Sequence, residues 1–234
     1  MIKIAMYNNK GGVAKSTSVI NLAYCFQKAG KTVLVVDCDQ QENCFMFFMT
    51  AKNSNALLPS EYEYIKHTTW KRYVELDERE TMNFDYILFD LPPAMTNEVK
   101  QILRHCGTVY VPTMLGEFEI QGLQKVTEEI AKQDAKLGGI FITMYQKEND
   151  GNLIADFQNA LSAQMMRTVI PYSRTVRESL KAGLPIEAYF IEKKVPRSPS
   201  SWKIVDAYDS LAEEMMSRLE KVDTPVTFLP KGEN

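Results

Sequence analysis

A short segment near the start of the chain combines glycines, lysines and hydroxyl groups at a spacing suited to binding phosphate. The segment reads Asn9-Lys10-Gly11-Gly12-Val13-Ala14-Lys15-Ser16-Thr17. Glycines let backbone N–H groups turn toward phosphate oxygens, a lysine reaches the β- and γ-phosphates, and a hydroxyl ligates magnesium. An amphipathic helix is expected to follow at once, and its N-terminus adds a positive dipole end. The segment therefore predicts a site for the phosphates of a nucleotide.

The segment departs from the common pattern G-x-x-x-x-G-K-[ST] because Asn9 and Ala14 stand where glycines are expected. It matches K-G-G-x-x-K-[ST], in which a second lysine, Lys10, precedes the glycine pair. Composition alone seldom yields these five fixed residues. The alternative is a glycine turn with incidental lysines, and the position directly after an apolar run argues against it.

Three aspartates follow two other apolar runs. Asp37 and Asp39 close the run Val35-Val36, and Asp90 closes Ile87-Leu88-Phe89. Ligands of open α/β sheets lie beyond the carboxyl ends of the strands, so we expect these carboxylates to converge near the phosphates.

The elements that must position these residues alternate along the chain. Short apolar runs and longer periodic segments predict an α/β fold, a mostly parallel twisted sheet with helices on both faces. We expect strands at Ile2–Tyr7, Thr32–Asp37, Tyr86–Asp90, Thr108–Pro112, Gly139–Thr143 and Thr168–Ile170. We expect helices at Lys15–Ala29, Glu98–Arg104, Ile120–Lys136, Leu153–Gln164, Val176–Ala182 and Ser201–Lys221, with Gly30 and Gly183 as C-terminal stops. Residues 50–80 are the least regular part, residues 1–234 form one domain, and the tail after about residue 223 is expected to be extended or mobile.

The composition limits the classes of function. The chain is 45% hydrophobic and 24% charged with a formal net charge of −3, which indicates a globular protein whose contact with nucleic acid would need a local basic patch. Its four cysteines form no metal-ligand pattern. Neither a signal peptide nor an apolar run of membrane-spanning length is present, so a cytoplasmic location without integral membrane association is expected.

With these motifs in place, the sequence resembles the ParA/MinD family of deviant Walker ATPases, most closely the ParA/Soj partition proteins. The resemblance covers nearly the whole chain. Later landmarks occur in the family's order: Val111-Pro112-Thr113, Glu117, Gln121-Gly122-Leu123, Phe141-Ile142-Thr143-Met144-Tyr145, Thr168-Val169-Ile170-Pro171, Val176-Arg177-Glu178-Ser179 and Gly183-Leu184-Pro185-Ile186.

The resemblance implies a role for each residue of the phosphate loop. Lys15 would hold the β- and γ-phosphates, and Lys10 would reach the nucleotide of a partner subunit. Ser16 would ligate Mg²⁺, and Thr17 would bind the α-phosphate. ATP would therefore favour a homodimer. The nucleotide contacts implied by position are Lys10, Gly11, Gly12, Val13, Ala14, Lys15, Ser16, Thr17, Met144 and Pro171.

The same resemblance assigns the aspartates. Asp39 would orient the attacking water, so Lys10, Lys15 and Asp39 are the implied catalytic residues, and Asp37 and Asp90 would support the Mg²⁺ shell together with Ser16. Gln40 stands where the family has proline, which leaves the geometry after Asp39 open.

A basic region lies between Ile170 and Lys203, with seven lysines and arginines against three glutamates. Such a patch could bind DNA phosphates without reading bases, or it could be an ordinary solvated surface. The resemblance implies nonspecific DNA binding through Arg177, Arg174, Lys181 and Lys203. The match of Arg174 is weaker, because the stretch from Pro171 to Val176 is two residues longer than is usual in the family.

Three functions remain open on this fold. The first is DNA partition with a ParB-like partner, in a protein that associates with the nucleoid when bound to ATP. The second is a MinD-like ATPase that positions a protein complex or acts at a membrane surface, although the last helix has an acidic polar side. The third is a nucleotide-dependent metabolic or redox enzyme. Its iron–sulfur form would need a cysteine between Leu91 and Met95, where none occurs.

Overall fold

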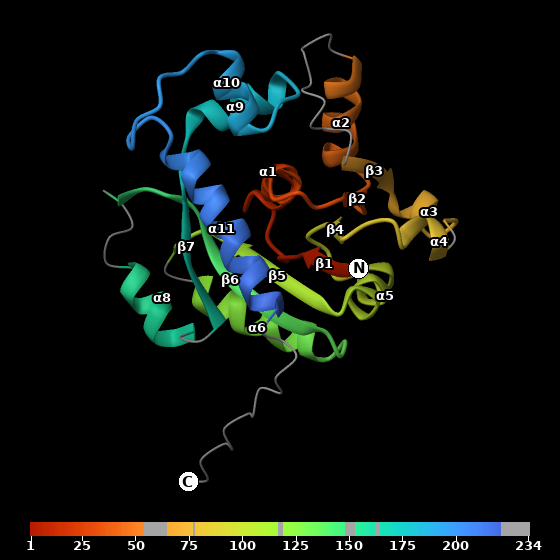
Figure 1. The fold of residues 1–234 in the computed structure, drawn as a ribbon. Coiled ribbons are helices and arrows are strands. Elements are labelled where there is room, and N and C mark those ends of the chain that lie inside the picture. Colours follow the sequence, from red (N-terminus) through yellow and green to blue (C-terminus); the bar gives the residue numbers. More distant parts are fainter. Residues whose placement is uncertain (54–64, 77, 117–118, 148–152, 162–163, 221–234) are drawn as a thin grey trace.

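Seven parallel strands form one sheet at the centre of the computed structural model, which describes residues 1–53, 65–76, 78–116, 119–147, 153–161 and 164–220 (Figure 1). The strand order is β3-β2-β4-β1-β5-β6-β7, and every pairing is parallel. The strands are β1 (Ile2–Met6), β2 (Val33–Asp37), β3 (Ile65–Thr69), β4 (Tyr86–Asp90), β5 (Thr108–Thr113), β6 (Lys136–Tyr145) and β7 (Met165–Pro171). The predicted α/β class and the predicted parallel sheet are confirmed.

Helices cover both faces of the sheet (Figure 1). One face packs against α1 (Lys15–Lys28), α2 (Asn43–Asn53), α9 (Arg174–Lys181), α10 (Ile186–Glu192) and α11 (Lys203–Glu220). The other packs against α3 (Trp70–Tyr73), α5 (Asn97–Cys106), α6 (Glu119–Ala131) and α8 (Leu153–Leu161), while the short α4 (Glu78–Thr81) precedes β4. Strand β1 shows why both faces are apolar: Ile4 and Met6 enter the first core, and Ala5 and Tyr7 the second.

Residues 50–80, expected to be the least regular part, contain three short elements that were not predicted, although residues 54–64 and 77 of this range lie outside the described residues. Strand β3 lies there, paired to β2 at the edge of the sheet, and α3 and α4 follow it. The sequence of β3 hides it, because only Ile65 and Thr68 of its five residues are buried and the rest are polar. Helices α2 and α10 were also not expected.

The other differences concern element ends. The helix expected to reach Lys136 ends at Ala131, because Asp134 takes a left-handed conformation with φ of 56° and β6 begins at Lys136. Gly30 and Gly183 have positive φ and follow α1 and α9, as expected for C-terminal stops. Glu117 and the tail after Glu220 lie outside the described residues. None of the described helices combines the length and apolar composition that a membrane span requires.

The sheet order determines which strand ends meet. Strand β4 lies between β2 and β1, with Asp90 in register with both Asp37 and Met6. Because the strands are parallel, the loop that leaves β1 and the acids that end β2 and β4 emerge at the same edge.

Candidate functional site

The loop between β1 and α1 has the backbone conformation of an anion cradle. Gly12 has φ of 77°, a conformation that favours glycine, and an added Cβ on Gly11 or Gly12 would meet no atom within 4 Å. Ala14 is the N-cap of α1, and its side chain makes no capping hydrogen bond. The first N–H groups of α1 therefore lack a side-chain cap and are available to phosphate oxygens.

Ala14 occupies the position where the common phosphate-loop pattern has glycine. Its φ and ψ are 61° and 33°, in the left-handed region. This conformation costs a residue with a Cβ about 1–2 kcal/mol. The loop thus keeps the glycine-type backbone despite the alanine.

The Lys15 side chain lies within this loop. Its Nζ donates to the carbonyl oxygens of Lys10 at 3.0 Å and Asn8 at 3.3 Å, and the residue is 8% exposed. Burial lowers the pKa of Lys15, while the charges of Asp90 and Asp39 oppose the shift. Phosphate oxygens would replace these carbonyl acceptors with charged ones, to which hydrogen bonds are stronger.

Two buried side chains that sequence reasoning did not assign to the site brace the loop. Asn8 Nδ2 donates to the Pro112 carbonyl on β5 at 2.8 Å, and its Oδ1 accepts from the Lys10 N–H at 3.0 Å. Thr143 Oγ1 lies 3.2 Å from the Val13 carbonyl oxygen and 3.0 Å from that of Thr113. Each residue lies at the carboxyl end of an expected strand, and Thr143 also belongs to the landmark Phe141-Ile142-Thr143-Met144-Tyr145.

Asp37 and Asp90 form a buried acidic pair beneath the loop, 2% and 1% exposed. Asp37 accepts from the N–H groups of Asp39 at 3.0 Å and Phe45 at 2.9 Å. Burial raises the pKa of Asp37 although these hydrogen bonds oppose it. Burial also raises the pKa of Asp90 to about 7, with the charge of Asp37 adding to the effect and the Ser16 hydrogen bond opposing it. Two carboxylates this close favour a shared cation.

The residues expected at the Mg²⁺ site fit a cation. Asp90 Oδ1 is buried and has no hydrogen-bond partner among the described residues, although its other oxygen has one. The Ser16 hydroxyl lies close enough to Asp90 to lower the pKa of that carboxyl, so a hydroxyl and two carboxylates come together, and these are oxygen ligands of the kind Mg²⁺ takes.

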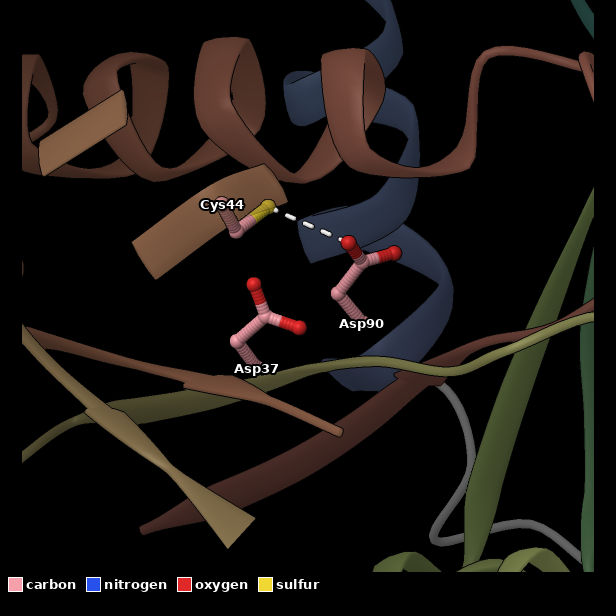
Figure 2. Close-up of side chains that lie close together, drawn as sticks. All are labelled: Asp37, Cys44 and Asp90. Atoms are coloured by element: carbon pink, nitrogen blue, oxygen red, sulfur yellow. Dashed lines mark hydrogen bonds between the residues drawn. The ribbon is translucent and has the colours of Figure 1, made fainter. Parts of the chain in front are cut away.

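Cys44 completes this group, and the sequence reasoning missed it. Its sulfur lies 3.2 Å from Asp90 Oδ2 and 3.6 Å from the Ser16 carbonyl oxygen, as Figure 2 shows for the first contact. The residue is fully buried in the first turn of α2. Because α2 was not expected, no sequence argument brought Cys44 to the aspartates.

Asp39 and the phosphate loop share one cavity of about 670 Å³. Its lining includes Gly11, Gly12, Ala14, Lys15, Ser16, Thr17, Asp39 and Met144. The turn after Asp39 forms with Gln40 in place of the family proline, and the N–H of Glu42 donates to the Asp39 carbonyl at 3.0 Å. The structure therefore brings Asp39 to the loop, as the motif analysis expected.

A second cavity of about 700 Å³ adjoins the first, and both are lined by Ala14, Thr17 and Met144. Pro171 lines it as well, so the two expected nucleotide contacts outside the phosphate loop, Met144 and Pro171, line the same cavity. Arg174, Arg177 and Lys181, expected at the DNA, line its α9 wall, whereas Lys203 is exposed at the start of α11.

Lys10 is not among the residues that line these two cavities. Its Nζ forms an ion pair with Glu119 of the same chain, at the start of α6. The expected contact with a partner subunit would require this pair to open.

Comparisons with known proteins agree with this geometry. Residues 4–186 match the family described as the CobQ/CobB/MinD/ParA nucleotide binding domain. The chain is 25% identical to the chromosome partitioning protein ParA of Myxococcus xanthus, over 95% of this chain and 89% of that protein. It is 26% identical to the chromosome-partitioning ATPase Soj of Thermus thermophilus, over 94% of this chain and 97% of that protein.

Solved structures show the same fold. The MinD cell division protein of Aquifex aeolicus superposes with a TM-score of 0.70 at 19% identity, covering 93% of this chain and 98% of that one. MinD of Pyrococcus horikoshii, complexed with Mg-ADP, superposes with a TM-score of 0.67 at 18% identity, covering 97% of this chain and 100% of that one. The fold is that of MinD and ParA P-loop NTPases, and the chain belongs to the CobQ/CobB/MinD/ParA nucleotide-binding domain family.

Proposed function

We propose that this chain is a ParA-type ATPase that dimerises on Mg-ATP, binds DNA nonspecifically and positions a plasmid, chromosome or mobile element together with a ParB-like partner. The observation that carries the ATPase part is the shared cavity, where the glycine-lined loop, Lys15, Ser16 and Asp39 meet above the buried pair Asp37 and Asp90. The similarity to the ParA and Soj partition proteins supports the partition part.

In this proposal ATP places its phosphates on the loop and its base in the adjoining cavity lined by Met144 and Pro171. Lys15 and the N–H groups of α1 neutralise the developing charge on the γ-phosphate, and Asp39 orients a water in line with it. Mg²⁺, held by Ser16 with Asp37 and Asp90 in support, would neutralise further charge on the β- and γ-phosphates. Lys10 of the partner subunit completes the site.

The proposed DNA binding depends on basic side chains that are exposed and not paired with acidic residues. Arg174, Arg177, Lys181 and Lys203 are exposed and pair with no described acidic residue, whereas Arg197 of the same region is bound to Asp206 at 3.0 Å. Unpaired cations can exchange their counterions for DNA phosphates, and this exchange gives sequence-independent affinity.

The test is DNA binding with ADP, ATP and a slowly hydrolysed ATP analogue. We expect binding only with the triphosphates. Arg177→Ala should weaken it and reduce the slope of log K against log salt by about 1, because one cation no longer neutralises a phosphate. Lys132→Ala, which removes one positive charge from the end of α6 on the opposite face, is the control. Nucleotide affinity is measured in parallel, because Arg177 also lines the base cavity.

The main alternative is a MinD-like ATPase that positions a protein complex or acts at a membrane surface, and the fold similarity to MinD favours it. It would be supported if DNA binding were absent in every nucleotide state while ATP still drove dimerisation. Absence of both DNA binding and ATP-driven dimerisation would reject the proposed ParA-type ATPase itself.

A further inference from the structure

Three potential metal ligands from three different elements meet at the carboxyl edge of the sheet. They are Asp37 at the end of β2, Asp90 at the end of β4 and Cys44 in the first turn of α2, and their ligand atoms all lie within 4.8 Å of one another (Figure 2). The backbone fixes this arrangement. Asp37 and Asp90 are register partners, and the hydrogen bond from the Phe45 N–H to Asp37 ties the start of α2 to β2.

The group is buried and lacks a full set of partners. All three residues are at most 2% exposed, and Asp90 Oδ1 has no hydrogen-bond partner among the described residues. A buried carboxylate oxygen without a donor normally implies a missing ligand, because an unsatisfied polar atom destabilises the fold. A cation would satisfy this oxygen and would also reduce the repulsion between the two carboxylates.

The Cys44 thiol determines which cation Asp37, Cys44 and Asp90 can bind best. Mg²⁺ takes oxygen ligands and keeps several waters, whereas Zn²⁺ and Cd²⁺ bind sulfur strongly and accept carboxylates beside it. We propose that Asp37, Cys44 and Asp90 form a site for a thiophilic divalent cation, with the Cys44 sulfur as a ligand. The ion replaces the thiol proton, which passes to solvent, and the Ser16 carbonyl oxygen, 3.6 Å from the sulfur, or a water supplies the fourth ligand.

The neighbouring residues provide a route to the site. Ser16 and Asn43, which adjoin Cys44 in space and in sequence, line the cavity of about 670 Å³ that holds the phosphate loop. The site uses the two aspartates expected to support Mg²⁺, so a bound Zn²⁺ would remove them from that role. The proposal goes beyond the proposed function, and its test needs no nucleotide.

The experiment titrates Cd²⁺ into the nucleotide-free chain of residues 1–234 and records the ultraviolet charge-transfer band of a cadmium–thiolate bond. We expect a band that saturates at one ion per chain, persists in millimolar Mg²⁺ and disappears when Zn²⁺ is added. Cys44→Ala should lose the band. Its Zn²⁺ affinity, measured in competition with a chromophoric chelator, should fall by more than about tenfold, because loss of a residue that only supports a metal ligand already lowers metal affinity by at least about tenfold. Cys38→Ala, which removes a nearby half-buried thiol, should keep both.

Wild-type protein that shows no band would overturn the proposal, as would a band that survives in Cys44→Ala or is removed by Mg²⁺. Cys44→Ser keeps the size of the side chain and serves if the alanine variant does not fold. Circular dichroism of each variant before titration separates loss of the site from loss of the fold. Because ATP is absent throughout, failure here leaves the ATPase proposal standing.

Discussion

Lys10 and Glu119 form an ion pair within one chain, although they are 109 residues apart in sequence. The lysine is the residue expected to act on the nucleotide of the partner subunit, and Glu119 at the start of α6 holds it in its own subunit. In the proposed ATP-bound dimer this pair would have to open in each subunit. The pair therefore opposes the state in which Lys10 would act.

Glu119→Ala should strengthen ATP-driven dimerisation. The Lys10 side chain is half exposed, and exposed ion pairs contribute about 0–1 kcal/mol each, so opening two pairs costs up to about 2 kcal/mol and the dissociation constant of the dimer should fall by up to about thirtyfold. Sedimentation with a slowly hydrolysed ATP analogue measures it. Glu129→Ala on the same helix, whose partner is Lys132, should have no such effect. Equal or weaker dimerisation of Glu119→Ala would show that the pair does not restrain Lys10.

Lys10→Ala should abolish ATP-driven dimerisation and hydrolysis while leaving much of the affinity for ADP. The reason is that Lys15 and the loop N–H groups, which would hold the β-phosphate within one subunit, are unaffected. Phosphate release and fluorescent-ADP binding measure the two properties. If turnover were unchanged, the role of Lys10 at the partner's nucleotide would be wrong.

Gly12→Ala should destabilise the chain by about 1 kcal/mol or more, because φ of 77° is unfavourable for alanine. Its Cβ would also enter the space open to phosphates, so ATP affinity should fall. Gly122→Ala is the matched control, since Gly122 lies within α6 with open space around it and alanine should stabilise that helix by about 0.5–1 kcal/mol. Denaturant unfolding of both variants gives the comparison, and a Gly12→Ala variant as stable as wild type would contradict the strain argument.

Glu214 should make the stability of the chain fall in acid. Burial would raise the pKa of Glu214, but hydrogen bonds from the Arg167 N–H and from Thr168, together with the charge of Arg218, outweigh it and lower the pKa. A carboxyl whose pKa is lowered by folding contributes stability above its unfolded pKa of about 4.3, and this is lost as the pH falls through the folded value.

Glu214→Gln should therefore lower the unfolding free energy at pH 7 and make it less dependent on pH below about 5. Urea unfolding across this range measures both effects. Glu213→Gln, at the exposed neighbouring position on α11, is the control. Identical acid slopes for Glu214→Gln and wild type would show that the contacts of Glu214 with β7 do not depend on its charge.

The sequence predicted the parts of the site that follow from strand order. Apolar runs ending in Asp37 and Asp90 indicated parallel strands, and parallel strands bring their carboxyl ends to one edge. Local patterns could not reveal Cys44 or Glu119, because these residues reach the site only through the packing of α2 and of the start of α6. Helix α2 itself was not predicted from the sequence. Edge strand β3 was missed because its exposed positions are polar.

Helix α9 carries Arg174, Arg177 and Lys181 and also walls the cavity expected to receive the base of ATP. If nucleotide changes the affinity of this helix for DNA, thermodynamic linkage requires DNA to change the affinity for nucleotide by the same factor. DNA bound to this eight-residue helix would then change how tightly the protein holds its nucleotide.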